Sequence, residues 1–220
     1  MAFSRVDPGA LPTEFAVFPL LGAMLLPRGK LPLNIFEPRY LAMTEDALAS
    51  GRMFGMIQPD MSAPPTPNGP ALFHVGCLGR LSSFSETDDG RFLITLDGIS
   101  RFTVVEELPM QRGYRRVRAS FAAFPDDVSP EPQAVTIDRA RMLTELRGYF
   151  RRGGMDANWE AIRRLSDDAL LNALSMICPF APAEKQALLE APDDKRRAEI
   201  LMALLRMGGC GEDEDDHKVS

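Results

Sequence analysis

The segment Phe15–Tyr40, FAVFPLLGAMLLPRGKLPLNIFEPRY, carries most of the information about the fold of this chain. Residues 31–36 alternate apolar side chains with others, the period-two pattern of a strand, and residues 13–18 are expected to form an earlier strand. Pro38 is well placed to be the first residue of a helix, because its fixed φ suits that position. Gly51 is expected to end that helix. The segment therefore predicts two strands that lead into one helix.

More strands are predicted in the first half of the chain, with turns between them. The ranges that fit are 54–58, 73–85, 91–108 and 116–121. Asp88-Asp89-Gly90 is a hairpin signal between the two longest of these strands. Gly98 predicts a bulge or bend in the second of them, because strand glycines mark such sites. The stretch 61–70, MSAPPTPNGP, is expected to be an exposed loop, because its prolines lack backbone donors.

The composition changes at 125–132, PDDVSPEP, which predicts a linker by its proline and aspartate content. Beyond it the apolar residues follow helical periods, and a first stripe holds Val135, Met142, Leu146 and Tyr149. Four more helices are predicted, with start signals at Trp159, Ser166, Pro182 and Asp193 or Asp194. The predicted class is α+β. It has a β-rich part with one embedded helix at 1–124, a helical bundle at 133–209 and a disordered acidic tail at 210–220.

The bulk properties are those of an ordinary globular protein. The 220 residues carry a formal net charge of -6, which argues against a general binder of nucleic acid or anionic membranes. The longest apolar stretch, residues 18–26, is interrupted by Pro19 and Gly22 and is too short to span a bilayer. The three cysteines are widely spaced, without a Cys-x-x-Cys pair. With no signal peptide at the start, they indicate reduced thiols in a cytoplasmic protein.

Catalytic and metal-binding patterns are weak. A nucleophile needs a base within reach, and the two histidines are His74 and His217. His74 and Cys77 are three positions apart on one predicted strand, so their side chains should leave opposite faces. Gly29-Lys30 lacks the glycine and the hydroxyl residue of a nucleotide-binding loop. Two histidines and three scattered cysteines do not form a structural zinc site, so we expect no metal, no cofactor and no enzymatic activity.

Four arginines cluster on the predicted strand near residue 116 and its approach: Arg112, Arg115, Arg116 and Arg118. A basic run of this kind could bind RNA, but Tyr114 is its only interleaved aromatic residue. The alternative is the solvent face of an edge strand, where charges discourage pairing with another chain. We favour the edge-strand interpretation, so nucleic acid is not an expected partner.

Several segments together resemble the N-terminal domain of Lon proteases, the module thought to receive substrates. The matching segments are Phe18-Pro19-Leu20, Leu31-Pro32-Leu33, Phe36-Glu37-Pro38-Arg39-Tyr40, Gly76–Leu81, Asp97–Phe102 and Lys185–Glu190. Cys77 stands where the family usually has a threonine. The resemblance implies a PUA-like pseudo-barrel followed by a helical bundle, without the ATPase and the Ser-Lys peptidase of the full protease.

By this resemblance, the chain is expected to be a stand-alone, non-catalytic module that binds proteins or peptides. Its partners would be unfolded or exposed hydrophobic protein segments, or a protease or chaperone complex. The alternative is a small-molecule or RNA-binding PUA-like module with a regulatory role. The oligomeric state stays open.

The expected binding residues surround the turn at Phe36–Tyr40. Arg39 and Tyr40 could line a groove for a peptide or ligand, extended by Phe36 and by the apolar residues Met24, Leu25 and Leu26. A closed, packed barrel there would instead move the site, for example to the cleft between the two halves. Three charges near apolar strands are expected to form a structural ion network that holds the helix against the barrel: Glu37, Arg39 and Arg101.

Overall fold

The structure is a computed structural model that describes residues 11–129 and 137–208. The predicted acidic tail, Val135 and most of the predicted linker's second half lie outside these residues. The first half contains eight strands, one α-helix and a short 3-10 helix within the described range. Their bounds are β1 Glu14–Pro19, β2 Lys30–Ile35, α1 Pro38–Ala49, β3 Met53–Ile57, β4 Pro59–Asp60, β5 Ala71–Leu72, β6 Val75–Glu86, β7 Phe92–Gln111, β8 Tyr114–Ser120 and η2 Pro125–Val128.

Six strands form one sheet in the order β2-β7-β6-β3-β1-β8, and a further pairing of β7 with β8 closes it into a barrel. The β1–β3 pair is parallel, and the other pairs of this sheet are antiparallel. Closure depends on the length of β7, 20 residues. One edge of β7 pairs with β6. The other edge pairs with β2 along residues 92–97 and with β8 along residues 103–111, which leaves a gap between them.

The predicted irregularity at Gly98 is confirmed as a bulge. Gly79 pairs with Gly98 and Leu78 pairs with Ser100, so Ile99 is the extra residue on β7. A Cβ atom at Gly98 would lie 2.0 Å from the carbonyl oxygen of Leu26, and no side chain fits in that space. The bulge therefore lets the loop between β1 and β2 pack directly on the barrel wall.

Apolar side chains fill the inside of the barrel. Phe15 and Phe102 meet edge to face with their ring centroids 5.0 Å apart. The other buried members of this cluster are Val17, Ile57, Leu78, Val117 and Ala119. They come from β1, β3, β6 and β8, so several strands of the closed sheet contribute to the core.

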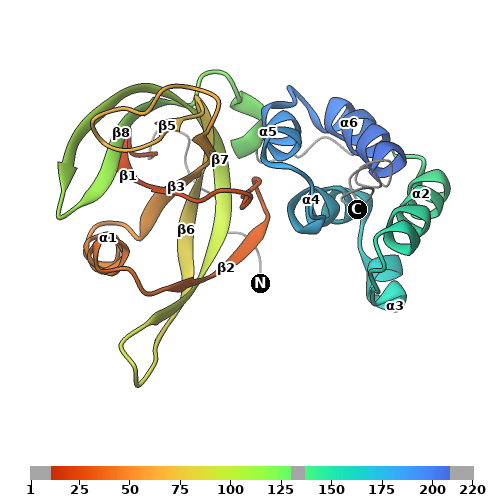
Figure 1. Cartoon of the computed structure of the whole chain (residues 1–220), viewed down its shortest axis with the longest axis horizontal. Coiled ribbons are helices and arrows are strands. Elements are labelled where there is room, and N and C mark those ends of the chain that lie inside the picture. The colour runs from red at the N-terminus through yellow and green to blue at the C-terminus, as the bar shows by residue number, and fades with distance from the viewer. Residues whose placement is uncertain (1–10, 130–136, 209–220) are drawn as a thin grey trace, which may run out of the picture.

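Helix α1 covers the side of the barrel that is remote from the other helices (Figure 1). It begins at Pro38 as predicted and is followed by Gly51, whose φ of 83° lies in the left-handed region. The carboxylate of Asp46 fastens it to the β7–β8 hairpin. That carboxylate accepts a 2.7 Å hydrogen bond from the Tyr114 hydroxyl and a 2.7 Å bond from Arg112.

The second half is helical, as the periodicity predicts. The helices are α2 Arg139–Arg152, α3 Trp159–Arg164, α4 Asp167–Ile177, α5 Pro182–Glu190 and α6 Asp194–Met207. Asp138, Asn158 and Asp193 cap α2, α3 and α6 by accepting hydrogen bonds from backbone amides of the first turn. Met142, Leu146 and Tyr149 are buried along α2, as predicted.

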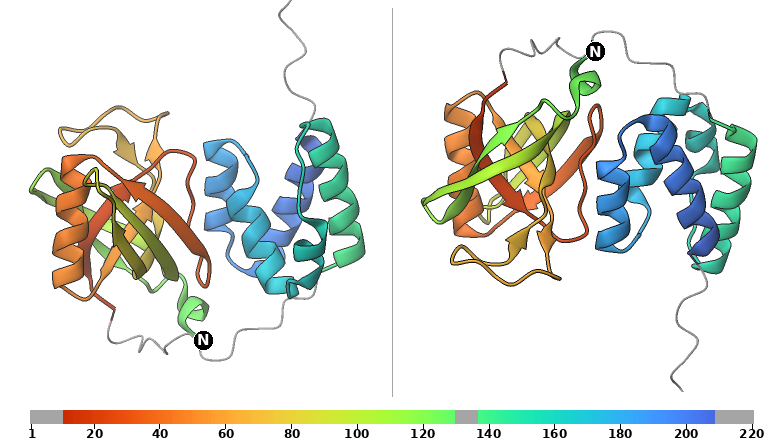
Figure 2. Two further views of the ribbon diagram at one scale, coloured as in Figure 1. Left: turned by 90° about the horizontal axis from the view of Figure 1, so that it is seen from below. Right: turned by 90° about the horizontal axis from the view of Figure 1, so that it is seen from above.

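Figure 2 shows that α4 and α5 lie beside the barrel, whereas α2 and α3 lie farthest from it. One apolar cluster continues from the outer wall of the barrel into the bundle. It includes Met24–Leu26 from the barrel and Leu170, Leu188 and Leu201 from the helices. The predicted α+β class is confirmed. None of the described helices combines the length and the apolar character that crossing a bilayer requires.

Replacing Tyr114 with phenylalanine should lower the free energy of unfolding by about 1–2 kcal/mol at neutral pH, because Asp46 loses a donor. The hydrogen bond from Tyr114 is the main cause that lowers the pKa of Asp46 below 3.8. The ionised carboxylate therefore stabilises the fold above pH 3.8, and this stabilisation is lost as the pH falls through the lowered pKa. Urea unfolding at several pH values would measure both effects.

Tyr149→Phe provides the control, because the Tyr149 hydroxyl donates to no carboxylate among the described residues. The difference between wild type and Tyr114→Phe should shrink as the pH falls below 3.8, whereas the Tyr149→Phe difference should not. A Tyr114→Phe effect that stays constant with pH would contradict the assignment.

Candidate functional site

The apolar residues that the sequence placed beside an exposed groove are core residues. Met24, Leu25 and Leu26 retain 2%, 1% and 0% of their exposed surface, and Tyr40 retains 6%. Tyr40 packs on Phe18 with the ring centroids 4.3 Å apart. The expectation that these four residues line an open groove is therefore wrong. Met24–Leu26 are buried between the bulged wall of the barrel and the docked helices, and Tyr40 is buried between α1 and the barrel.

Phe36 and Arg39 are the two predicted binding residues that reach the surface. Phe36 is 61% exposed, and the guanidinium of Arg91 lies 5.8 Å from its ring centroid. Arg39 forms a 2.8 Å ion pair with Glu37 and stacks 4.6 Å from the ring centroid of Tyr40. These residues form a small exposed cluster at the start of α1, and their part in binding stays a prediction.

The predicted network of Glu37, Arg39 and Arg101 does not exist as one unit. Glu37 and Arg39 pair with each other at the surface, with about half of each side chain exposed. Arg101 is 3% exposed and pairs with Asp127 instead, at 2.8 Å. They are separate because Arg101 faces the helical half of the molecule, whereas Glu37 is the N-cap of α1 and Arg39 lies in its first turn.

The side chain of Arg101 connects three parts of the chain. It donates two hydrogen bonds to the carboxylate of Asp127 in η2, at 2.9 and 2.8 Å. Its remaining terminal nitrogen donates to the carbonyl oxygens of Leu189, at 3.1 Å, and Ala191. The guanidinium also lies 4.1 Å from the ring centroid of Phe124. We call this group the Arg101 clamp: it joins the barrel to η2 and to the end of α5.

A second set of buried polar contacts joins α5 to the barrel. The Gln58 amide donates to the Pro182 carbonyl at 3.0 Å and to Gln186 Oε1 at 3.1 Å. Gln186 Nε2 in turn donates to the carbonyl of Val75 at 3.1 Å. Lys185 Nζ donates to the Gly22 carbonyl at 2.7 Å, and burial lowers the pKa of this amine. The cleft between the halves, named above as an alternative site, is therefore closed by hydrogen bonds at these points.

The cysteines inside the described residues are poor nucleophiles. Burial raises the pKa of Cys77, with a further contribution from Asp127, and burial raises the pKa of Cys178 to about 12. A reactive cysteine needs the opposite shift, towards a thiolate at neutral pH. His74 is exposed just before β6 while Cys77 is buried, so the two side chains do not form a pair. Residues 11–129 and 137–208 contain no group of three His, Cys, Asp or Glu side chains suited to a metal ion.

The arginines near β8 are paired with carboxylates. Arg112 contacts Glu45 and Asp46, and Arg118 contacts Glu14 and Glu106. Arg115 is buried and pairs with Glu107, and Arg116 lies 3.8 Å from Glu14. The edge-strand interpretation is wrong, because β8 pairs with β1 on one side and with β7 on the other. Pairing with acids reduces the positive charge that this surface could offer to RNA.

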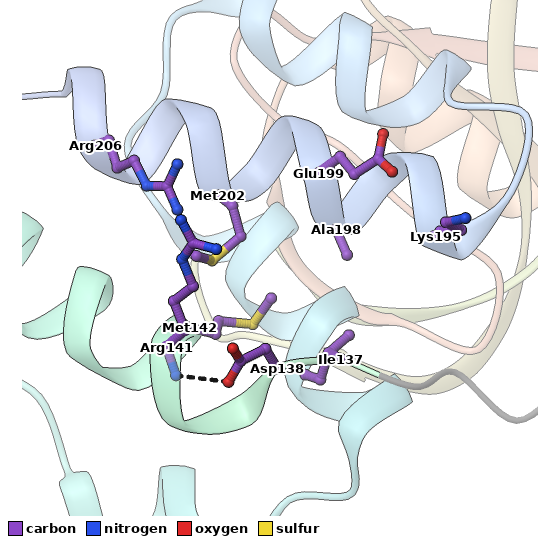
Figure 3. Close-up of a pocket in the computed structure, with 9 residues that line it drawn as sticks. All are labelled: Ile137, Asp138, Arg141, Met142, Lys195, Ala198, Glu199, Met202 and Arg206. Carbon is purple, nitrogen blue, oxygen red and sulfur yellow. Dashed lines mark hydrogen bonds between the residues drawn. The ribbon is translucent and has the colours of Figure 1, made fainter.

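A hollow of about 430 Å³ opens between α2 and α6, and we call it the α2–α6 groove (Figure 3). Its floor is apolar and contains Met142 and Met202, whose side chains extend into the space between the helices. Charged side chains form the rim. The residues that line it are Ile137, Asp138, Arg141, Met142, Lys195, Ala198, Glu199, Met202 and Arg206. The sequence places Met142 on a buried stripe and carries no signal that α2 and α6 are adjacent, so this groove could not be predicted from it.

A second hollow, of about 420 Å³, lies over β2, β6 and β7. Its lining contains no ionisable side chain: Pro32, Leu33, Asn34, Ser83, Ser85, Leu93, Ile94 and Thr95. The α2–α6 groove combines an apolar floor with charged groups, which is the arrangement that gives both affinity and selectivity for a polypeptide. It is therefore the stronger candidate site.

The fold defines the protein as an α+β chain in which a closed barrel carries an appended helical bundle. Two solved structures share it. They are a Lon N-terminal domain protein from Xanthomonas campestris, with a TM-score of 0.59 and 24% identity, and the N-terminal domain of Mycobacterium avium complex Lon protease, with a TM-score of 0.59 and 18% identity. Both alignments cover 87% of this chain, with 98% and 97% of those chains.

The chain belongs to the family of the ATP-dependent protease La (LON) substrate-binding domain, whose family model matches residues 14–207. Similar curated proteins include the Lon protease of Anaeromyxobacter dehalogenans, 25% identical over 89% of this chain, and Lon protease 2 of Myxococcus xanthus, 24% identical over 89%. The chain spans only 23% and 24% of the length of these two relatives. The resemblance seen in the sequence is therefore confirmed at the level of this domain.

Replacing Arg101 with methionine should lower the free energy of unfolding by about 3–5 kcal/mol, because Asp127 would keep a buried charge without its partner. Arg101→Lys should also be destabilising, since an ammonium group cannot reproduce the planar set of donors that reaches Asp127 and two carbonyls. Chemical unfolding of the purified variants would measure these losses.

Arg118→Met is the matched control, because Arg118 also contacts two partner segments but is exposed. Its loss should cost less than about 1 kcal/mol. If Arg101→Met were as mild as Arg118→Met, the Arg101 clamp would not determine the stability of the fold.

Proposed function

We propose that this chain is a non-catalytic binding module that recognises exposed apolar segments of unfolded proteins. The surface that binds these segments would also be suited to docking onto a protease or chaperone complex. The observation that carries the proposal is the match of residues 14–207 to the LON substrate-binding domain family. The proposal concerns what these 220 residues do by themselves, without an ATPase or peptidase.

Exposed apolar side chains support this function, because segments of unfolded proteins are held largely by apolar contact. Leu21 is 51% exposed and Ile177 is 76% exposed. Each stands next to a carbonyl, of Gly22 and Met176, that accepts a hydrogen bond from Lys185. The two residues therefore lie on either side of the junction between barrel and bundle. Together with the floor of the α2–α6 groove, they offer apolar contact area at this junction and on the bundle.

The non-catalytic part of the proposal is supported by the chemistry of the described thiols and by the sequence. Burial holds the pKa of both Cys77 and Cys178 above the usual range, so neither is prepared to attack a substrate. Gly29 packs against Met176 in the turn before β2, and Lys30, the first residue of β2, forms an ion pair with Asp97 at 2.8 Å. Both described cysteines are free, which supports a reducing, cytoplasmic environment.

The test compares a permanently unfolded protein, reduced and alkylated, with the same protein in its native form. The purified chain should bind the unfolded form and leave the native form unbound in a fluorescence anisotropy titration. It should neither cleave the bound protein nor hydrolyse ATP. Equal binding of both forms, or binding of neither the unfolded protein nor a protease partner, would refute the proposed function.

A further inference from the structure

Some of the charged side chains around the α2–α6 groove have hydrogen-bond or ion-pair partners, and others have none. Its two acids already have partners: Asp138 accepts a 3.0 Å hydrogen bond from the backbone amide of Arg141, and Glu199 pairs with Arg196 at 2.8 Å. The side chains of Arg141 and Lys195 have no ion-pair or hydrogen-bond partner anywhere in residues 11–129 and 137–208. The lining as a whole holds three cations and two acids, so the groove presents a small net positive charge beside apolar surface.

The free cations stand at opposite ends of the groove. Figure 3 shows Arg141 reaching from α2 towards Arg206 at one end, with Lys195 at the other end of α6. Arg206 forms an ion pair with Glu145 at 3.1 Å. Arg141 and Arg206 thus bring two positive charges to one end of the groove, and Glu145 is the one carboxylate among the described residues that pairs with either of them. An anionic group bound there would relieve their mutual repulsion. The same holds, with a single charge, at the Lys195 end.

The floor between these ends is apolar and adaptable. Met142 and Met202 contribute flexible, polarisable side chains, which can fit different apolar groups. Ala198 leaves room between them and the rim. Along α6, the distance from Lys195 to Arg206 is about 16 Å. An extended segment covers that length in about five residues.

From this arrangement we infer that the α2–α6 groove binds an extended segment of another protein that has apolar residues flanked by Asp or Glu about five residues apart. The apolar side chains rest on the methionines, one carboxylate meets Arg141 and Arg206, and the other meets Lys195. The assignment rests on the proposed function and adds the site and the class of segment that the site selects.

The acidic run of the chain itself, Glu212–Asp216, matches the charge of the groove but contains no apolar residue for its floor. A segment of a partner protein satisfies both the charge and the apolar surface. The partner segment is therefore the occupant to which the geometry points, and the acidic run is a competitor that the experiment must measure.

The experiment titrates the full chain with three labelled peptides that share one leucine- and methionine-containing centre. Their flanking residues are Asp, Ser or Lys. Fluorescence anisotropy should show that the Asp peptide binds best, with an affinity that weakens as salt is added, and that the Lys peptide binds worst. Equal affinity for the three peptides would overturn the inference while leaving the proposed function in place.

Charge reversal locates the site. The double variant Arg141→Glu, Lys195→Glu should bind the Asp peptide at least about tenfold more weakly, a loss of ~1.4 kcal/mol. The control with the same charge change is Arg151→Glu, Arg163→Glu, at exposed positions outside the lining of the groove, and it should bind as wild type does. Ala198→Phe, which fills the groove without changing charge, should weaken all three peptides. Circular dichroism would confirm that each variant is folded.

A loss as large in the control as in the Arg141, Lys195 variant would show a general charge effect and overturn the assignment. Failure of wild type to bind any peptide or unfolded protein would refute the proposed function as well. A full-length variant with Glu212–Asp216 changed to Gln and Asn tests whether the chain's own acidic run occupies the groove. If it bound the Asp peptide at least about tenfold more tightly than wild type, the chain's own acidic run would be the resident ligand, which contradicts the inference.

Discussion

The buried Arg101 side chain determines how the two halves of this molecule fit together. It lies on β7 just after the bulge, where β6 pairs with one edge of the strand and the other edge is open in the gap between β2 and β8. Asp127 fills that gap by accepting from both the backbone amide and the guanidinium of Arg101. A buried charge must be paired, so Asp127 is fixed on the barrel, and the carbonyls at the end of α5 are fixed with it.

This constraint explains which helices remain available for binding. On α5, the side chains of Lys185 and Gln186 are buried and donate hydrogen bonds to carbonyl groups of the barrel. Leu188, on the same helix, belongs to the apolar core. The segment 185–190, which carries part of the family resemblance, therefore serves the contact between the halves. Helices α4 and α5 lie beside the barrel, and α2 lies on the far side of the bundle (Figure 2). The α2–α6 groove is lined by residues of these two helices and stays free of the contact with the barrel.

Local pattern was enough to predict much of the fold, and long-range contact decided the rest. Pro38, Pro182 and Gly98 act through their own backbone geometry, and each was placed correctly. Arg101 binds a carboxylate 26 residues away and carbonyls 88 and 90 residues away, so its partners could not be read from its neighbours. Met24–Leu26 have the composition of an exposed apolar loop and become core only because the helices dock against them. The groove required knowledge of which helices are adjacent.

The most direct test asks whether the Arg101 clamp makes the two halves unfold together. Trp159 fluorescence reports the bundle, and the reaction of the buried Cys77 thiol, followed by mass spectrometry, reports the barrel. In wild type the two probes should give one coincident urea transition, as expected of a single cooperative unit. In Asp127→Asn, which keeps the shape but removes the charge, the two transitions should separate. Separate transitions in wild type, or coincident ones in the variant, would contradict the central role of the Arg101 clamp.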